Sequence, residues 1–266
     1  TKEVKASELE PGDTILTPRR LPMPDETVGE VNVLEHITLD QLDDRRVYVY
    51  GFDEDILTEL RNGEVIRKKP SEDSDRRRYY YRYDGVDILR DSLEQNYIER
   101  GYLPAETVIE LGWEELAADC ELKTYRVGGE ETTMPVTLPV DDALVELLAY
   151  YVSEGHVGPR QAGFTFGAHE TELVEATERA VDRITGSSTT VVRERNSTRV
   201  KAFGSPLAMF LQAVCGDSSE TKRIPEFVYE LAPEYQQRFI AALYQGDGSD
   251  AHPGNELSHT TTSEDL

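Results

Sequence analysis

The chain has 266 residues and a formal net charge of −24, from 52 acidic and 28 basic side chains. This length allows one large domain or two to three small ones, each with a buried core. No apolar run approaches the roughly 20 residues that span a bilayer, and the charged start TKEVKASELE lacks a signal-peptide core. We therefore expect a cytoplasmic protein without membrane contacts. Cys120 and Cys215 belong to no CxxC or Cys/His cluster, which argues against a disulfide framework and against a zinc site.

The acidic residues are spread along the whole chain, and arginine greatly outnumbers lysine. This pattern resembles that of proteins from extreme halophiles. In molar salt the Debye length falls to about 3 Å, so a general acidic surface repels DNA little and local basic patches decide binding. The alternative is an acidic protein that does not contact nucleic acid.

The first half of the chain predicts short strands followed by a mixed region. Residues 4–20 alternate in polarity around a Pro-Gly-Asp turn, which predicts two strands of a small β unit. Farther along, residues 47–50 predict a strand, and residues 54–61 and 87–100 predict helices. Between these helices lies the segment RRRYYYRY. It is either a charged loop or a contact to DNA backbone phosphates through Arg76, Arg77, Arg78 and Arg82.

The second half has clearer signals and predicts a mixed α+β fold. Its order is helix, strand, helix, hairpin, helix and helix. The predicted segments are a helix at 144–152, a strand at 164–166, a helix at 169–185, hairpin strands at 191–195 and 199–203 around Asn196-Ser197-Thr198, a helix capped by Ser205-Pro206, and a helix from Pro233 to Gly246.

Two nonapeptides in this half, LLAYYVSEG at 147–155 and IAALYQGDG at 240–248, align without a gap. Each has small residues at positions three and seven, an acid at position eight and glycine at position nine. Small residues four apart share a helix face, so the two helices can pack closely. The glycine permits a left-handed cap just past each acid, Glu154 and Asp247. The predicted interface residues are Ala149, Ser153, Ala242 and Gly246.

Paired helix ends would bring the two carboxylates together, where they repel each other unless a cation lies between them. A divalent metal such as Mg²⁺ or Mn²⁺ suits this position, because a few carboxylate oxygens, water and substrate phosphate complete its coordination. In the alternative reading, Glu154 and Asp247 are surface acids beside cap glycines.

The nonapeptides resemble the dodecapeptide motif of LAGLIDADG homing endonucleases, in the form found inside inteins. The likeness extends from about residue 134 to residue 266. KRIPEF at 222–227 resembles the block that supplies a basic residue to the active site, which places Lys222 in that role. The N-terminal VKASELEPGDTILTPR resembles a strand pair of the β-rich, self-splicing (Hint) domain of inteins.

This resemblance implies an α-β-β-α-β-β unit and a second motif helix, preceded by part of a splicing domain. We expect four regions. They are splicing-domain strands at 1–29, a connecting or DNA-recognition region at 30–133, a first LAGLIDADG unit at 134–238, and the start of a second unit at 239–266.

The implied activity is metal-dependent, site-specific cleavage of double-stranded DNA. Glu154 and Asp247 would be the metal ligands, and Lys222 would stabilise charge or position water. The DNA would contact the β-sheet. If the hairpin strands are in register, four cations form one basic ribbon on a shared face; otherwise this is a solvated outer face. The four cations are Arg193, Arg195, Arg199 and Lys201.

Some features depart from a complete intein or nuclease. Only 18 of the 266 residues follow Gly248, too few for a second sheet, and Thr1 is not the nucleophilic Cys or Ser of an intein. No histidine precedes an asparagine. We therefore expect an internal fragment of a larger intein within a haloarchaeal replication protein, inactive alone and flanked by host (extein) segments. Two alternatives are a LAGLIDADG-like regulator that binds DNA without cutting it, and a splicing element with a degenerate nuclease.

Overall fold

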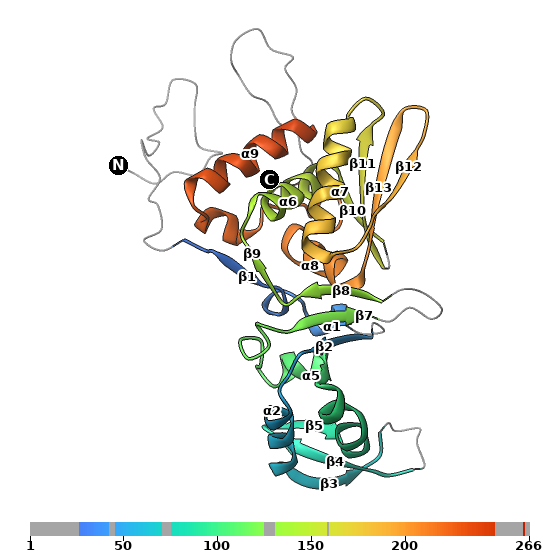
Figure 1. Ribbon diagram of the computed structural model, residues 1–266, viewed down its shortest axis with the longest axis vertical. Helices are drawn as coiled ribbons and strands as arrows, with labels where there is room; N and C mark the ends of the chain where they lie inside the picture. Colours follow the sequence, from blue (N-terminus) through green and yellow to red (C-terminus); the bar gives the residue numbers. More distant parts are fainter. Residues whose placement is uncertain are drawn as a thin grey trace, which may run out of the picture.

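The computed structural model describes residues 27–42, 46–70, 76–124, 131–158, 160–247 and 263. Over these residues the chain has the predicted α+β class, with helices and small antiparallel sheets. The strands predicted within residues 4–20 lie outside the described residues. The molecule is elongated (Figure 1). At one end lies the sheet of β3 (Glu64–Lys68), β4 (Arg78–Tyr83) and β5 (Val86–Leu89), and at the other lie helices α6 (Asp142–Glu154) and α9 (Pro233–Asp247). Within the described residues, no helix has the length and apolar character needed to cross a membrane.

Two sheets connect the first half of the chain to the second. One pairs β1 (Glu30–Asn32) with β9 (Thr137–Pro139). The other has the order β6-β2-β7-β8. Its strands are β2 (Val47–Tyr50), β6 (Tyr102–Pro104), β7 (Glu121–Thr124) and β8 (Thr132–Pro135). Since β8 and β9 lead directly into α6, these sheets form the base of the C-terminal unit.

A three-stranded sheet of order β3-β4-β5 forms the far end of the molecule. RRRYYYRY is not the charged loop of the alternative prediction, because residues 78–83 of this segment form the central strand β4. The helix predicted at 87–100 is wrong for its first three residues, which pair with β4 and bury Ile88 opposite Tyr81. The elements of this part are α1 (Leu39–Leu42), α2 (Glu54–Glu59), β3 (Glu64–Lys68), β4 (Arg78–Tyr83), β5 (Val86–Leu89), the helical stretch from α3 (Arg90–Ser92) to α4 (Ile98–Arg100), and α5 (Ala105–Glu110).

The C-terminal half follows the predicted order closely and contains the α-β-β-α-β-β succession. Its antiparallel sheet has the order β10-β11-β13-β12. The elements are α6 (Asp142–Glu154), β10 (Gly155–Gly158), β11 (Gln161–Gly167), α7 (Thr171–Thr185), β12 (Thr190–Arg193), β13 (Ser197–Phe203), α8 (Ser205–Cys215) and α9 (Pro233–Asp247).

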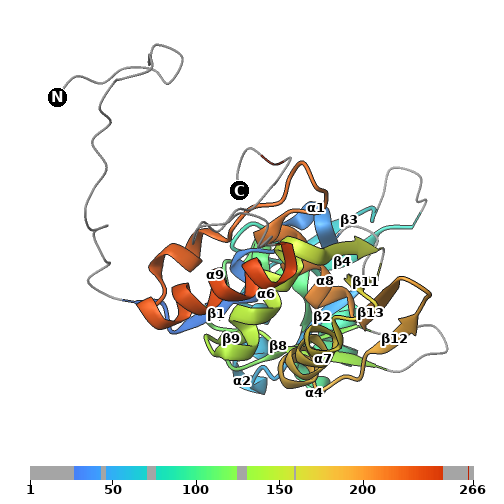
Figure 2. The same cartoon turned by 90° about the horizontal axis from the view of Figure 1, so that it is seen from above.

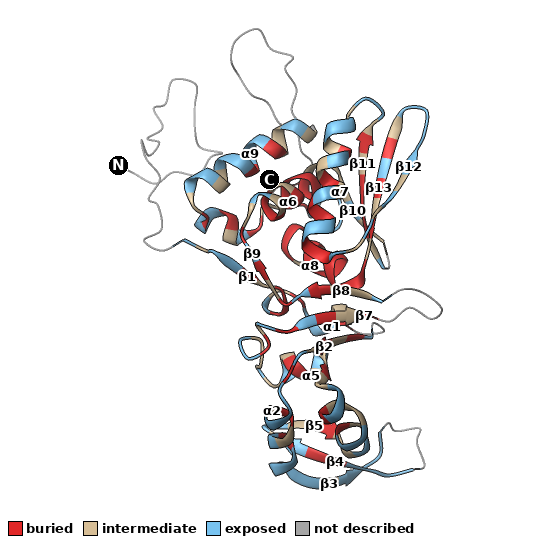
Figure 3. Ribbon diagram, viewed as in Figure 1, coloured by how far each residue is buried: buried red, intermediate tan, exposed pale blue. Residues whose placement is uncertain are grey.

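Helix α6 is the centre of this half. The Asp141 side chain caps it by accepting a hydrogen bond from the Leu144 N–H at 3.0 Å. Its residues from Leu144 to Val152 are almost all buried, since α7, α8, α9 and β11 contact different faces of the helix. In Figure 3, most of α6 and α8 has the red colour of buried residues, whereas β3 is exposed along most of its length. A helix that is apolar all round must lie inside the fold, which explains the near-continuous apolar run of its sequence.

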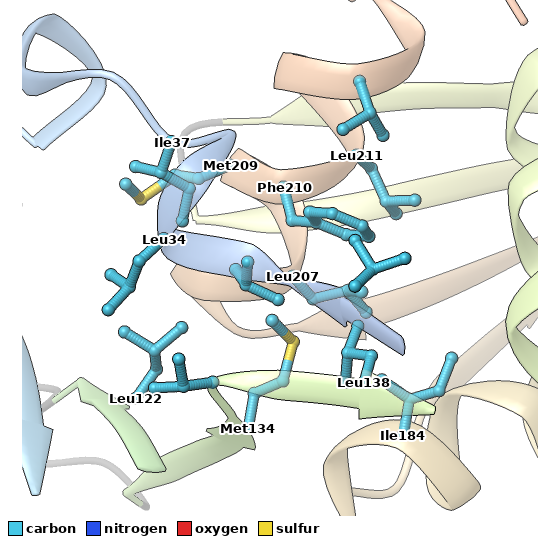
Figure 4. Packing of buried hydrophobic residues seen from close by; sticks show 14 of the residues in the cluster. Leu34, Ile37, Leu122, Met134, Leu138, Ile184, Leu207, Met209, Phe210 and Leu211 are labelled. Atoms are coloured by element: carbon cyan, nitrogen blue, oxygen red, sulfur yellow. The ribbon is translucent and has the colours of Figure 1, made fainter. Parts of the chain in front are cut away.

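Helix α8 joins the C-terminal unit to the earlier sheets. Phe210 and Leu207 of α8 pack near Leu34 and Met134, which come from the first part of the chain and from β8 (Figure 4). All four side chains are fully or almost fully buried. The core is therefore continuous from β8 to the sheet beneath α6.

An ion cluster holds the three-stranded sheet together. Arg82 in β4 contacts the Asp87 carboxylate of β5 with Nε at 2.7 Å and its terminal nitrogen at 3.0 Å. The Lys68 ammonium of β3 contacts the same carboxylate. These bonds lower the pKa of Asp87 to about 2, and the bond from Arg82 has the largest effect. The cluster links one side chain from each strand, so it fixes the position of the hairpin formed by β3 and β4.

We predict that Asp87→Asn lowers the free energy of unfolding by about 1 kcal/mol at pH 7, because the two cations are exposed and solvent screens the pair. Since the folded pKa lies below the unfolded value of about 3.9, the wild-type advantage is complete above pH 4 and disappears as the pH falls towards 2. Urea unfolding of both proteins at several pH values measures this difference in the free energy of unfolding. Asp119→Asn, in an exposed turn, is the control. Equal stability of the Asp87 variant and wild type at pH 7 would contradict the role of the cluster.

Candidate functional site

The C-terminal ends of α6 and α9 meet, and the missing side chain of Gly246 allows the two helices to approach closely. A β-carbon at Gly246 of α9 would overlap Ser153 Oγ, lie 2.8 Å from Ser153 Cβ, and lie 3.6 Å from Glu154 Cγ. Ala149 and Ala242, one turn earlier in each helix, are 0% and 3% exposed. Figures 1 and 2 show the two helices side by side from perpendicular directions. The small residues at positions three and seven of the nonapeptides therefore lie where the helices pack.

The two acids lie at the C-terminal ends of their helices. Glu154 is the last residue of α6 and is half-buried. Asp247 is the last residue of α9 and directly follows Gly246, which contacts the end of α6. Among the residues that the structure describes, no group of three or more His, Cys, Asp or Glu side chains gathers as a metal-binding cluster. The two helix ends thus bring two carboxylate-bearing positions together.

Lys222 lies at the last turn of α6. Its side chain is only 5% exposed, and its ammonium donates a hydrogen bond to the carbonyl oxygen of Tyr151, three residues before Glu154. The ammonium also lies 3.5 Å from the centroid of the Tyr151 ring. Burying an ammonium is costly unless such partners compensate for the lost water. Lys222 is therefore a buried residue with partners on α6 and not a solvated surface lysine.

The loop that carries Lys222 is tied to α6 a second time. The Tyr151 hydroxyl donates to the carbonyl oxygen of Gly216 at 2.9 Å, and this bond is buried. Gly216 has a φ of +82°, and a β-carbon there would lie 2.6 Å from the carbonyl carbon of Thr221. The turn between α8 and Lys222 is therefore tight and requires glycine. Tyr151 contacts both ends of this turn and so positions Lys222.

Gly155 does not form the left-handed cap that the sequence predicts. It has φ −84° and ψ 155°, an extended conformation. The chain passes straight from α6 into β10, where Gly155 pairs with Phe164. Glycine is needed for another reason, since a β-carbon would lie 2.6 Å from Tyr151 Cα. Gly248, the glycine of the second nonapeptide, lies outside the described residues.

His156 lies beside the candidate site, although no sequence pattern singled it out. It is exposed on the outer face of the sheet, and its ring covers Gly163, where a β-carbon would lie 2.5 Å from His156 Cε1. Partial burial, followed by the positive charges of Lys222, Arg199 and Lys201, lowers the pKa of His156. The available signal was its place two residues after the acid of the first nonapeptide.

The expected ribbon of four cations is wrong in its register. Val192 pairs with Arg199 and Thr190 with Lys201, so Arg199 and Lys201 do share the outer face, but Val192 lies there too. Arg193 pairs with the buried Thr198 and is on the opposite face, and Arg195 is in the turn. The turn is centred before Ser197 rather than on it. Because this shifts the pairing by an odd number of residues, the faces of one strand are exchanged relative to the other.

The outer face of the sheet nevertheless carries positive charge. Thr190, Lys201, Gly163 and His156 form one row across its four strands. In the next row, the Arg199 guanidinium contacts the Glu194 carboxylate at 2.6 Å, and both side chains remain partly exposed. This face begins at β10, directly after Glu154.

The four other candidate cations lie far from the two acids. Arg78 and Arg82 are in β4, and Arg76 and Arg77 directly precede it, at the opposite end of the molecule from α6 and α9 (Figure 1). All four side chains are exposed. Any function that they share with Glu154 requires a partner long enough to contact both ends.

No protein-family model matches the chain. It is 32% identical over 153 residues to a DNA polymerase of Thermococcus kodakarensis, covering 54% of this chain and 9% of that protein. It is 23% identical over 295 residues to a DNA polymerase of another Thermococcus strain, covering 99% of this chain and 17% of that protein. A replication factor C small subunit of Methanocaldococcus jannaschii is 29% identical over 128 residues, which is 41% of this chain and 7% of that protein.

The chain is thus homologous to segments of archaeal DNA polymerases and spans less than a fifth of their length. The same chain is similar to a small part of a replication factor C small subunit. These organisms give no support to the expected halophilic source.

We predict that Gly246→Ala lowers the free energy of unfolding by about 1–3 kcal/mol, because the new methyl group forces α6 and α9 apart. In a helix without such a contact, the same change would raise the free energy of unfolding by about 1 kcal/mol. The sign of the measured change therefore distinguishes a close helix contact from an open one. Ser153→Gly in the Gly246→Ala background should recover part of the loss, as measured in a double-mutant cycle by urea unfolding. Gln245→Ala, at the exposed neighbouring position, is the control. A more stable Gly246→Ala variant would contradict the close approach.

Proposed function

We propose that this chain carries the catalytic centre of a metal-dependent, site-specific DNA endonuclease of the LAGLIDADG type, within an intein. One observation carries the proposal. The helices of two matching nonapeptides end against each other, with Gly246 in contact with Ser153 and Glu154. The acid of each nonapeptide is the last residue of its helix. Two helices of ordinary packing would have no need for an acid at both of the ends that meet.

The residues at this junction fit a divalent metal ion. Two carboxylates at adjoining helix C-termini repel each other and gain nothing from the helix dipoles, so a cation would stabilise them. Glu154 and Asp247 would hold Mg²⁺ or Mn²⁺ through oxygen ligands, with water and phosphate completing the coordination. Such an ion lowers the pKa of bound water and offsets charge on the scissile phosphate.

Lys222 supplies a fixed positive charge at the same junction. Its ammonium is held by the Tyr151 carbonyl one helical turn from Glu154. In a partly buried site this charge interacts more strongly with phosphate than it would in water. We assign Lys222 to stabilising the charge that develops on the phosphate, and Tyr151 to positioning Lys222.

DNA would bind along the outer face of the sheet. This face starts beside Glu154 and carries His156, Lys201 and Arg199. A strongly acidic chain needs such a local patch to contact phosphates. The cations there would position the duplex over the acids, and base contacts would come from the groove-facing side chains.

The comparisons support the intein part of the proposal. Similarity to small parts of both a DNA polymerase and a replication factor C subunit is expected of a segment inserted into different hosts. The flanking host segments would be its partners in splicing. A regulator that binds DNA without cutting has no need for Glu154 and Asp247, so their presence favours the nuclease.

We predict that Glu154→Gln and Asp247→Asn each lower Mg²⁺-dependent cleavage at least 100-fold, since each removes a negatively charged metal ligand. The test uses the longer protein that contains this chain, a plasmid library of random inserts, and sequencing of the cut ends. Glu172→Gln, at an exposed position of α7, should cut as the wild type does. DNA binding in Ca²⁺ is measured in parallel. Binding without any cleavage by the wild type would contradict the nuclease and favour the regulator.

We predict that Lys222→Met lowers the cleavage rate by about 10²–10³-fold while DNA affinity changes little, because the lost charge acts mainly on the transition state. Lys222→Arg should restore part of the rate. Tyr151→Phe removes the bond to Gly216 but leaves the carbonyl that holds Lys222, so it controls for loss of stability. Should Lys222→Met lower the melting temperature and leave the cleavage rate of the folded protein unchanged, Lys222 would have only a structural role.

A further inference from the structure

The end of the β3–β4 hairpin carries the densest group of cations among the described residues. We call this group the basic hairpin, and its six members are Arg67, Lys68, Lys69, Arg76, Arg77 and Arg78. All six are exposed. Residues 67–78 contain these six cations and three acids, a net charge of +3, in a chain whose total is −24. So strong a local reversal of charge indicates an anionic partner.

Strand pairing brings the two halves of the basic hairpin together. Lys68 pairs with Arg78, and Arg67 pairs with Tyr79. The Arg67 guanidinium lies 5.6 Å from the Tyr79 ring, which is 49% exposed. Arg82, towards the other end of β4, and Lys68, in the basic hairpin, both contact the Asp87 carboxylate of β5. The cations are therefore presented from a braced sheet.

We propose that the basic hairpin binds the phosphate backbone of duplex DNA at a distance from the cleavage centre. Choosing DNA as the partner rests on the proposed function. The basic hairpin lies at the opposite end of the long axis from α6 and α9 (Figure 1). A duplex is long, stiff and uniformly charged, so one molecule can contact both ends of this elongated protein. The DNA footprint then extends to one side of the cut.

An acidic protein is the competing partner, and the surface fits it less well. Protein interfaces have an apolar centre with few charged residues, whereas DNA-binding surfaces are polar and strongly positive. The exposed large apolar side chains of β3 and β4 are Val65 and Tyr79, set among arginine and lysine. Exposed positive charges without an apolar centre match phosphates.

The test measures how DNA affinity depends on salt. Fluorescence anisotropy follows the binding of the chain to a fluorescein-labelled 40-base-pair duplex of random sequence, over a range of KCl concentrations without divalent metal. One variant combines Arg67→Gln, Arg77→Gln and Arg78→Gln. The control combines Arg46→Gln, Arg179→Gln and Arg183→Gln, which removes the same charge from exposed positions outside the basic hairpin. Circular dichroism checks that each variant is folded.

Each lost phosphate contact lowers the slope of log K against log salt concentration by about 0.9, so the hairpin variant should lower it by about 2–3 while the control changes it by less than about 1. Affinity at low salt should fall at least tenfold in the hairpin variant only. Replacing the same three arginines by lysine should keep the wild-type slope, because phosphate contacts need charge rather than guanidinium geometry.

A hairpin variant with the wild-type slope would overturn the inference. Absence of duplex binding by the unmodified chain would overturn it as well. Cleavage by the longer protein is read separately. If Glu154→Gln cuts normally while the hairpin variant loses its salt slope, the proposed nuclease centre fails and the hairpin inference stands.

Discussion

The close approach of α6 and α9 is the constraint on which the candidate site depends. Gly246 leaves room for Ser153 and Glu154, and nothing larger than glycine fits there without moving a helix. This contact brings together the ends of two segments separated by more than 80 residues in the sequence. Lys222 and the start of the sheet are then placed relative to those ends through Tyr151 and Gly155. Geometry set by backbone packing is more rigid than geometry set by loops, which is what a catalytic centre requires.

Two local features reduce stability at this junction. Lys222 is buried, and Gly216 has a φ of +82°. Each would destabilise an isolated element by about 1 kcal/mol or more. Tyr151 offsets part of this, since its ring, hydroxyl and carbonyl contact Lys222 and Gly216. Destabilising features that lie close together are typical of functional sites. The buried faces of α6 and α8 supply the stability that permits them.

Local patterns predicted most of the C-terminal half, including the helix pair, but few elements of residues 30–133. The helix periods of α6, α7, α8 and α9 were visible because each has a buried face and a clear start. Three features could not be predicted. The pairing of β12 with β13 depends on where a turn of few residues is centred, and an odd shift exchanges the faces. The burial of Lys222 depends on Tyr151, 71 residues away. Residues 87–89 form a strand because they pair with β4, a contact that local sequence patterns do not show.

The proposed centre requires that Glu154 and Asp247 act on the same metal ion. The most direct test is an electron paramagnetic resonance titration of Mn²⁺ into the chain in 1 M KCl, where weak binding to the acidic surface is screened. Glu154→Gln, Asp247→Asn and the double variant are compared with the wild type. A shared ion predicts that either substitution removes most of the tight binding and that the second adds little. Unchanged tight binding in both single variants, or fully additive losses, would show that the two acids do not share an ion.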